Sequence, residues 1–182
     1  MNLPNILTLS RIAMIPLMLI SFYWFSQDGK VVAALLFALA AVTDWFDGYL
    51  ARRLNQTTPL GAFLDPVADK LIVAVALVLL VENFASAWLT IPAAIIVGRE
   101  IVISALREWM AELGKRANIA VSYIGKVKTA AQMGSITVLM GGEDYPWLLD
   151  IGYAGLYVAA VLTIWSMMVY LRAAWPDLRQ KP

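Results

Sequence analysis

The chain has 182 residues, of which 61% are hydrophobic and only 15% are charged, and its mean hydropathy is +0.72. Soluble domains average about 45–50% apolar and about 25% charged residues, so this composition excludes an ordinary water-soluble domain and indicates a membrane protein. The net charge of +1 argues against nucleic acid as a partner, and the absence of cysteine and histidine excludes disulfides and histidine chemistry, so any bound metal must rest on oxygen ligands.

Six apolar segments are close to the length of about 20 residues that crosses a bilayer. The connections between them are short, so we expect one membrane domain over residues 1–182, an all-α fold with six transmembrane helices. The predicted helices are, in chain order, Ile6–Phe25, Val31–Arg52, Leu60–Val81, Ala85–Leu106, Ile124–Met140 and Ile151–Leu171.

Six spans place both termini on one side of the membrane, and the basic residues predict that this side is the cytoplasm. With the termini inside, every one of the 14 lysine and arginine residues except Lys30 falls in the cytoplasmic half. Trp88, Trp147 and Tyr153 then lie near the outer boundary, as is typical of an aromatic belt.

Four aspartates interrupt the apolar pattern of the second and third predicted helices. An α-helix turns about 100° per residue, so Asp44 and Asp47 lie about 60° apart on one face, and Asp65 and Asp69 lie about 40° apart on another. The short connection makes these helices antiparallel neighbours, with both pairs toward the cytoplasmic end. Because an ionised carboxylate inside a membrane is costly, such a residue indicates a functional site by default.

Two divalent cations would balance the four negative charges, and a ligand set made only of oxygen suits Mg²⁺ or Mn²⁺. The alternative interpretation is that the acids pair with basic residues, the candidates being Arg52, Arg53, Lys70 and Arg99. Small residues share the aspartate faces and permit the close approach of a bulky ligand or of a neighbouring helix, namely Gly48, Ala51 and Gly61.

The two helices together carry one continuous pattern, Asp44-x-x-Asp47-Gly48-x-x-Ala51-Arg52, then eight residues, then Gly61-x-x-x-Asp65-x-x-x-Asp69. This pattern resembles the signature of the CDP-alcohol phosphatidyltransferases, and every fixed position of that signature is matched. Further segments resemble the members of this family whose acceptor is glycerol 3-phosphate, namely Pro4–Arg11, Arg99-Glu100, Ala105–Trp109 and Gly125–Thr129.

The resemblance implies a multi-pass enzyme of the bacterial cytoplasmic (inner) membrane, whose partners are CDP-diacylglycerol, glycerol 3-phosphate and membrane lipids. It implies that the sn-1 hydroxyl of glycerol 3-phosphate displaces CMP from CDP-diacylglycerol, and that the protein is a homodimer. It further implies that Asp44, Asp47 and Asp65 hold one cation, that Asp44, Asp65 and Asp69 hold a second, and that Asp69 is the general base. The residues that it implies for CDP-diacylglycerol binding are Gly48, Ala51, Arg52 and Gly61.

Two further groups of polar residues complete the predicted site. Asn5, Thr8 and Arg11 share one face of the first helix and are expected to cover the nucleotide, with helix capping by Asn5 as the alternative. The acceptor is a dianion that needs cations on the cytoplasmic side, the candidates being Arg99, Arg107, Lys126 and Lys128.

Each of these cations also has a simpler explanation. Arg99 would instead form an ion pair with one of the aspartates. Lys126 and Lys128, which we expect near the membrane surface, would instead contact lipid headgroups.

Two other functions stay open at this point. The aspartate signature does not separate glycerol 3-phosphate from an inositol phosphate, serine or phospholipid acceptor, although the basic residues favour a phosphorylated one. A small divalent-cation transporter would use the same acids, but the outer halves of the predicted helices are apolar and offer no polar path.

Overall fold

The computed structural model describes residues 3–25, 28–54, 59–112, 114 and 123–178, without the side chains of residues 3–4, 45–54, 59–60, 62, 123–124 and 176–178. This part of the chain is all α-helical, as the apolar pattern predicts. The helices are α1 (Leu3–Trp24), α2 (Gly29–Leu54), α3 (Pro59–Phe84), α4 (Ala87–Glu112), α5 (Tyr123–Gly141) and α6 (Pro146–Leu178).

Each observed helix matches one predicted helix, and the largest differences lie in α4 and α6. Helix α4 continues to Glu112, beyond the expected end at Leu106, and α6 has 33 residues. Hydropathy finds only the apolar run, whereas backbone hydrogen bonding continues through polar residues beyond that run.

Three of the helices, α1, α4 and α6, are long and apolar enough to cross a membrane. Large apolar side chains also face outward, as Leu35 on α2, Val78 on α3 and Val161 on α6 do, each more than 60% exposed. Such extensive apolar exposure is typical of a surface in contact with lipid. That all six helices span the membrane stays a prediction.

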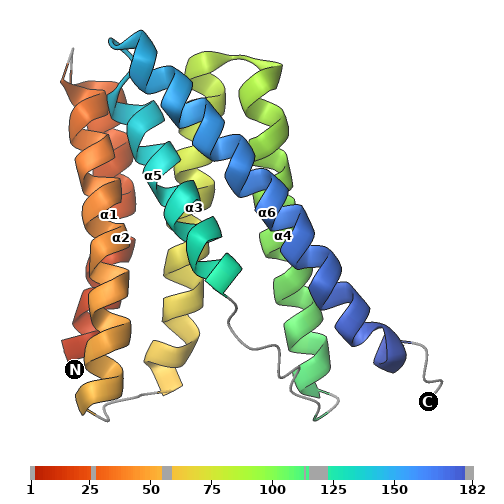
Figure 1. The fold of residues 1–182 in the computed structure, drawn as a ribbon. Coiled ribbons are helices and arrows are strands. Elements are labelled where there is room, and N and C mark those ends of the chain that lie inside the picture. The colour runs from red at the N-terminus through yellow and green to blue at the C-terminus, as the bar shows by residue number, and fades with distance from the viewer. Residues whose placement is uncertain (1–2, 26–27, 55–58, 113, 115–122, 179–182) are drawn as a thin grey trace.

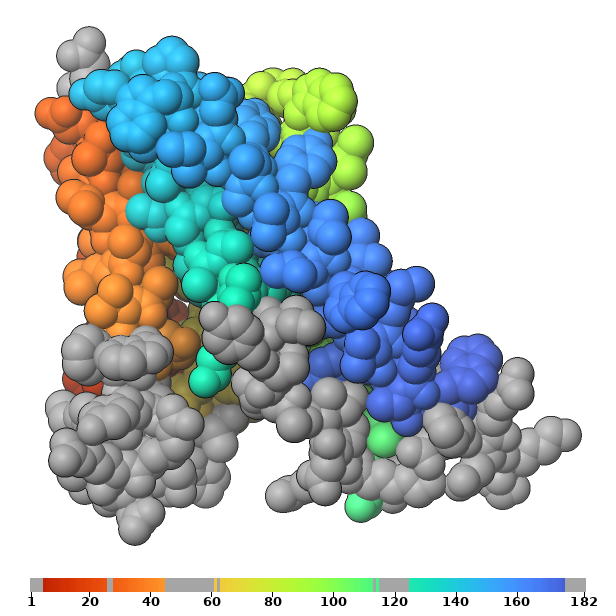
Figure 2. Space-filling view, viewed as in Figure 1, coloured from red at the N-terminus to blue at the C-terminus, as the bar shows by residue number. Residues whose placement is uncertain are grey.

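The helices run alternately up and down, so that both termini lie at the same end of the bundle (Figure 1). Helix α1 packs against α2 and α3, and α4 packs against α3 and α6. Helix α5 lies between α2, α3 and α6, and its contact with α6 is the most extensive in the described chain. Figure 2 shows that α6, in blue, crosses the front of the molecule diagonally. In the upper part of the view its atoms pack closely against those of α5.

The close approach of α6 to α5 depends on two glycines of α6. A Cβ atom at Gly152 would lie 2.6 Å from Leu139 Cγ, and one at Gly155 would lie 2.3 Å from Ser135 Oγ. Both distances are shorter than van der Waals contact, so a larger residue at either position would displace the side chain of Leu139 or Ser135 on α5. This packing fixes the position of α5, which carries part of the polar site.

The polar residues of the predicted site gather in the half of the bundle that holds the termini. Arg11 lies in the first half of α1, Asp44 in the second half of α2, and Asp65 and Asp69 in the first half of α3. The alternation of the helices brings these three segments to the same depth (Figure 1).

We predict that this end of the bundle faces the cytoplasm. Because the chain has no cysteine, single-cysteine variants can be labelled without further changes. Glu112 ends α4 near the termini, and Asp144 lies between α5 and α6 at the opposite end; both are exposed. In intact cells, Asp144→Cys should react with an impermeant thiol reagent and Glu112→Cys should react only after permeabilisation, whereas the reverse pattern would contradict the orientation.

Candidate active site

A buried arginine joins three of the four predicted aspartates. Arg11 is only 1% exposed, and its Nη1 atom lies 2.6 Å from Asp44 Oδ1 and 2.5 Å from Asp69 Oδ1. Its Nη2 atom lies 3.5 Å from Asp65 Oδ1, which also accepts a hydrogen bond from the Thr8 hydroxyl. Hydrogen bonds between ions are among the strongest in proteins, so Arg11 ties α1 to both α2 and α3.

The polar face of α1 explains how Arg11 reaches the carboxylates. Asn5, Thr8 and Arg11 are all buried, and their spacing of three residues keeps them on one side of the helix. The prediction that they share one face is therefore confirmed. The described contacts of Thr8 and Arg11 are with carboxylates, and nucleotide binding by the three residues stays a prediction.

The carboxylates and the arginine differ in their access to solvent. Asp44, Asp65 and Asp69 keep 39–42% of their side-chain surface exposed, while the Arg11 side chain that pairs with them is buried. The guanidinium contacts one side of the cluster and leaves another side open. A ligand can therefore approach the acids without first unpacking the helices.

Two of the ion pairs predicted as the alternative are not formed. Arg99 pairs with Glu100 and not with an aspartate, and Lys70 forms no ion pair within the described residues, while the side chains of Arg52 and Arg53 lie outside the described part of the chain. The described basic partner of the aspartates is Arg11, which sequence analysis assigned to the nucleotide. It faces both acidic helices because α1 packs against α2 and α3 together.

Several predicted site residues lie where only the backbone is described. These residues are all in α2, and they are Asp47, Gly48, Ala51 and Arg52. Gly61, in contrast, is described and buried, one helical turn before Asp65 on α3.

The donor chemistry of the cluster fits a divalent cation. The Oδ1 atoms of Asp44 and Asp69 already converge on one cationic nitrogen, and carboxylate oxygen is the ligand that Mg²⁺ and Mn²⁺ prefer. Among the described side chains, no three acidic residues lie close enough together to form a metal site by themselves. Arg11 contributes one positive charge to this group of carboxylates.

A second cluster of charges, centred on Glu100, holds two of the predicted acceptor-binding cations. Glu100 Oε1 lies 3.0 Å from Lys128 Nζ and 2.9 Å from Arg99 Nη1. Arg99 Nη2 also donates to Ser166 Oγ at 3.2 Å, which links α4 to α6. The structure therefore brings Arg99 and Lys128 together through their common partner Glu100 on α4.

The alternative that Lys128 contacts lipid headgroups is wrong, because its side chain is buried and pairs with Glu100. Lys126 is exposed, whereas Lys128 is only 6% exposed. Two residues apart on a helix correspond to about 200°, so neighbouring lysines point to opposite sides of α5. Arg107 is exposed and donates to Tyr170 Oη at 3.0 Å, and Arg99 lies beside the same ring.

Sequence analysis missed Glu100 as a site residue. The signal was available, because Glu100 is an acid within an apolar helix, the same feature that distinguished the aspartates. Its position next to Arg99 concealed its role, since adjacent residues face different directions on a helix and their pairing was not expected.

A polar cavity of about 140 Å³ connects the two charge clusters. It has room for a small polar molecule, and its wall includes Asp69 from the first cluster together with Glu100 and Lys128 from the second. The remaining polar residues that line it are Lys70, Thr129 and Gln132.

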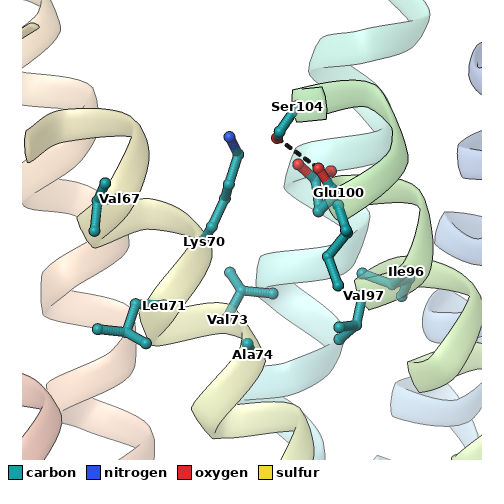
Figure 3. Close-up of a pocket in the computed structure, with 10 residues that line it drawn as sticks. Val67, Lys70, Leu71, Val73, Ala74, Ile96, Val97, Glu100 and Ser104 are labelled. Atoms are coloured by element: carbon teal, nitrogen blue, oxygen red, sulfur yellow. Dashed lines mark hydrogen bonds between the residues drawn. The ribbon is translucent and has the colours of Figure 1, made fainter. Parts of the chain in front are cut away.

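An apolar cavity of about 440 Å³ adjoins the polar one between α3 and α4. The two cavities share Lys70, Val73 and Glu100. Figure 3 shows the Lys70 side chain extending between the two helices, above a wall that includes Leu71 and Val97. Charged and apolar surfaces therefore meet where α3 faces α4, as a substrate with a polar head and an apolar tail requires.

Comparison with known proteins places the chain in a family. The model of the CDP-alcohol phosphatidyltransferases matches residues 1–165, so the chain belongs to the CDP-alcohol phosphatidyltransferase family. Enzymes of this family generally depend on divalent cations.

Similar proteins from other bacteria share nearly the whole length of the chain. One from Sodalis glossinidius is 59% identical over 98% of this chain and 97% of its own length, and one from Yersinia pestis is 56% identical over the same shares. One from Salmonella choleraesuis is 56% identical over 97% of each chain. All three are named CDP-diacylglycerol–glycerol-3-phosphate 3-phosphatidyltransferase.

We predict that Lys128→Met lowers stability, because it leaves Glu100 partly buried with Arg99 as its remaining partner. The loss should be about 2 kcal/mol, less than for a fully buried pair because Glu100 keeps some exposure. The matched control Lys126→Met, at the exposed position, should change stability by less than about 0.5 kcal/mol. Thermal unfolding in detergent measures both.

The double variant Glu100→Gln/Lys128→Met tests whether the unpaired Glu100 carboxylate causes the loss of stability in Lys128→Met. It should be less destabilised than the sum of the single variants, because the stranded carboxylate is then neutral. Equal melting temperatures for Lys128→Met and Lys126→Met would contradict the importance of the ion pair.

Proposed function

We propose that the protein transfers the phosphatidyl group of CDP-diacylglycerol to glycerol 3-phosphate, giving phosphatidylglycerophosphate and CMP, as a step of phospholipid biosynthesis. The observation that carries this proposal is the position of Asp69, which belongs to the carboxylate cluster and also lines the cavity that contains Lys128. One residue thus borders both a site suited to a diphosphate and a site suited to a small anion. The names of the similar proteins support the same reaction.

The reaction is one displacement at phosphorus. The sn-1 hydroxyl oxygen of glycerol 3-phosphate forms a bond to the lipid-bearing phosphorus, and the bond from that phosphorus to CMP breaks. Asp69 takes the hydroxyl proton, because this carboxylate is held in place by Arg11 and lines the acceptor cavity. Such transfers depend mainly on positioning and on charge neutralisation.

Two divalent cations, Mg²⁺ or Mn²⁺, complete the proposed site. Asp44, Asp47 and Asp65 would hold one, and Asp44, Asp65 and Asp69 would hold the other. When bound, such ions neutralise phosphate charge and polarise the phosphorus–oxygen bonds. The oxygen-only donor set and the open side of the carboxylates support this assignment, which requires Asp44, Asp65 and Asp69 to lie closer together than they do in this structure.

CDP-diacylglycerol would bind where the carboxylates meet the polar face of α1. The contacts of Thr8 and Arg11 support this placement, because both side chains bind carboxylates that are proposed to hold the cations of the diphosphate. The other residues proposed to bind this substrate are Gly48, Ala51, Arg52 and Gly61.

Glycerol 3-phosphate would occupy the polar cavity between α3, α4 and α5. Lys128 lines this cavity directly, and Arg99 reaches it through their common partner Glu100. Lys126 and Arg107 remain proposed contacts at the rim, since neither is among the residues that line the cavity.

The proposed location is the bacterial inner membrane, crossed six times, with the site open to the cytoplasm that supplies glycerol 3-phosphate. The distribution of basic residues and the common position of the two termini support this arrangement (Figure 1). We also propose a homodimer, for which cross-linking in membranes is the direct test; only monomers after cross-linking would contradict it.

We predict that the purified protein releases CMP from CDP-diacylglycerol when glycerol 3-phosphate is supplied. Serine, inositol phosphate and a phospholipid should each support little release, because the cavity offers cations for a small phosphorylated acceptor. A radiolabelled CMP-release assay with each acceptor measures this. Release that prefers another acceptor would place the protein elsewhere in the family, and no release with any acceptor would contradict the proposed activity.

We predict that EDTA abolishes this activity and that Mg²⁺ or Mn²⁺ restores it. Asp44→Asn and Asp65→Asn should reduce kcat by at least about a thousandfold, because each residue is proposed to contact both ions. The matched control Asp144→Asn, which lies at the other end of the bundle, should keep wild-type kcat. Full turnover in a metal-free preparation would contradict the metal site.

A further inference from the structure

Gln132 is a buried amide at the polar cavity whose oxygen has no partner. The side chain is 5% exposed, and its Oε1 atom makes no hydrogen bond in the described structure. Buried polar atoms are nearly always hydrogen-bonded, so this exception, in a side chain that lines a cavity, points to a ligand that reaches the amide when its terminal bond rotates.

Gln132 lies next to the residues proposed to bind the acceptor. It follows Lys128 by one helical turn on α5, so both side chains lie on the same face of that helix. Both line the cavity together with Asp69 from α3. The cavity therefore has a cation, a carboxylate and a neutral amide on its wall.

The other polar groups of the cavity are already engaged or are charged. Glu100 and Lys128 pair with each other, and the Thr129 hydroxyl donates to the carbonyl of Gly125 within α5. Lys70 carries a charge and extends between α3 and α4 (Figure 3). Gln132 is the neutral group of this wall that keeps an unused hydrogen-bonding atom.

We infer that Gln132 determines acceptor specificity by binding the secondary, sn-2 hydroxyl of glycerol 3-phosphate. This inference rests on the proposed function. The acceptor has a phosphate, which suits Lys128, and a primary hydroxyl, which Asp69 deprotonates. The secondary hydroxyl lies between these two groups, and it can donate a hydrogen bond to the amide oxygen.

This arrangement selects against acceptors that lack the secondary hydroxyl. A site built to hydrogen-bond a substrate hydroxyl rejects an analogue without it, because the buried group of the protein then stays unpaired. A cationic side chain at this position would attract the phosphate of the acceptor. A neutral amide does not, so it stays available for the hydroxyl.

The test compares glycerol 3-phosphate with 3-hydroxypropyl phosphate, which keeps the phosphate and the primary hydroxyl but lacks the secondary one. Wild-type protein should show a kcat/KM about tenfold to a hundredfold higher for glycerol 3-phosphate. Gln132→Met should lose that advantage while its kcat/KM for 3-hydroxypropyl phosphate stays within about twofold of wild type.

The matched control is Ser135→Ala on the same helix. Ser135 is also buried and polar, but its hydroxyl donates to the carbonyl of Ala131 and it does not line the cavity. This variant should keep the wild-type preference between the two acceptors. Thermal unfolding of each variant in detergent accompanies the kinetics.

Three results would overturn the inference. An equal loss for both acceptors in Gln132→Met would indicate phosphate binding or a structural role, and no loss for either would indicate no contact with the acceptor. Wild-type protein that uses both acceptors equally would overturn it without any variant, even if Gln132→Met does not fold. A wild-type protein that releases CMP with neither acceptor would instead contradict the proposed function, and with it this assignment.

Discussion

The placement of Arg11 among the aspartates is the interaction on which the rest of the site depends. Three acids on α2 and α3 repel one another inside an apolar bundle, and one sealed guanidinium on α1 offsets that repulsion. The ion pairs therefore fix the relative position of three helices around carboxylates that stay accessible from one side.

Helix α3 connects this cluster to the second one, which contains Glu100. Asp69 pairs with Arg11 and also lines the cavity whose far wall contains Glu100 and Lys128. Two oppositely charged regions thus meet at one carboxylate. That arrangement suits a reaction in which a lipid-linked diphosphate and a small anionic acceptor must approach each other, because each needs countercharge of its own at the point of contact.

The basic residues of the cytoplasmic half are not equivalent. Lys128 is buried and paired, whereas Lys126, two residues earlier, is exposed. Both Arg99 and Arg107 lie beside the Tyr170 ring, but Arg99 is also held by Glu100 and Ser166, whereas Arg107 is exposed. Burying a charged side chain such as Lys128 or Arg99 costs free energy unless that side chain serves packing or binding. Lys126 and Arg107 have the character of interfacial anchors.

The sequence by itself determined the helices, the faces that carry the acids, and the common face of Asn5, Thr8 and Arg11, because these depend on spacing within one helix and the helical repeat is fixed. It also singled out the family signature. Only the tertiary structure decided that Arg11 pairs with the acids, that Glu100 joins Arg99 to Lys128, and that Gln132 lies at the cavity. Those contacts join different helices, and they depend on how far each helix is rotated and shifted against its neighbours, which is set by packing such as that of Gly152 against Leu139.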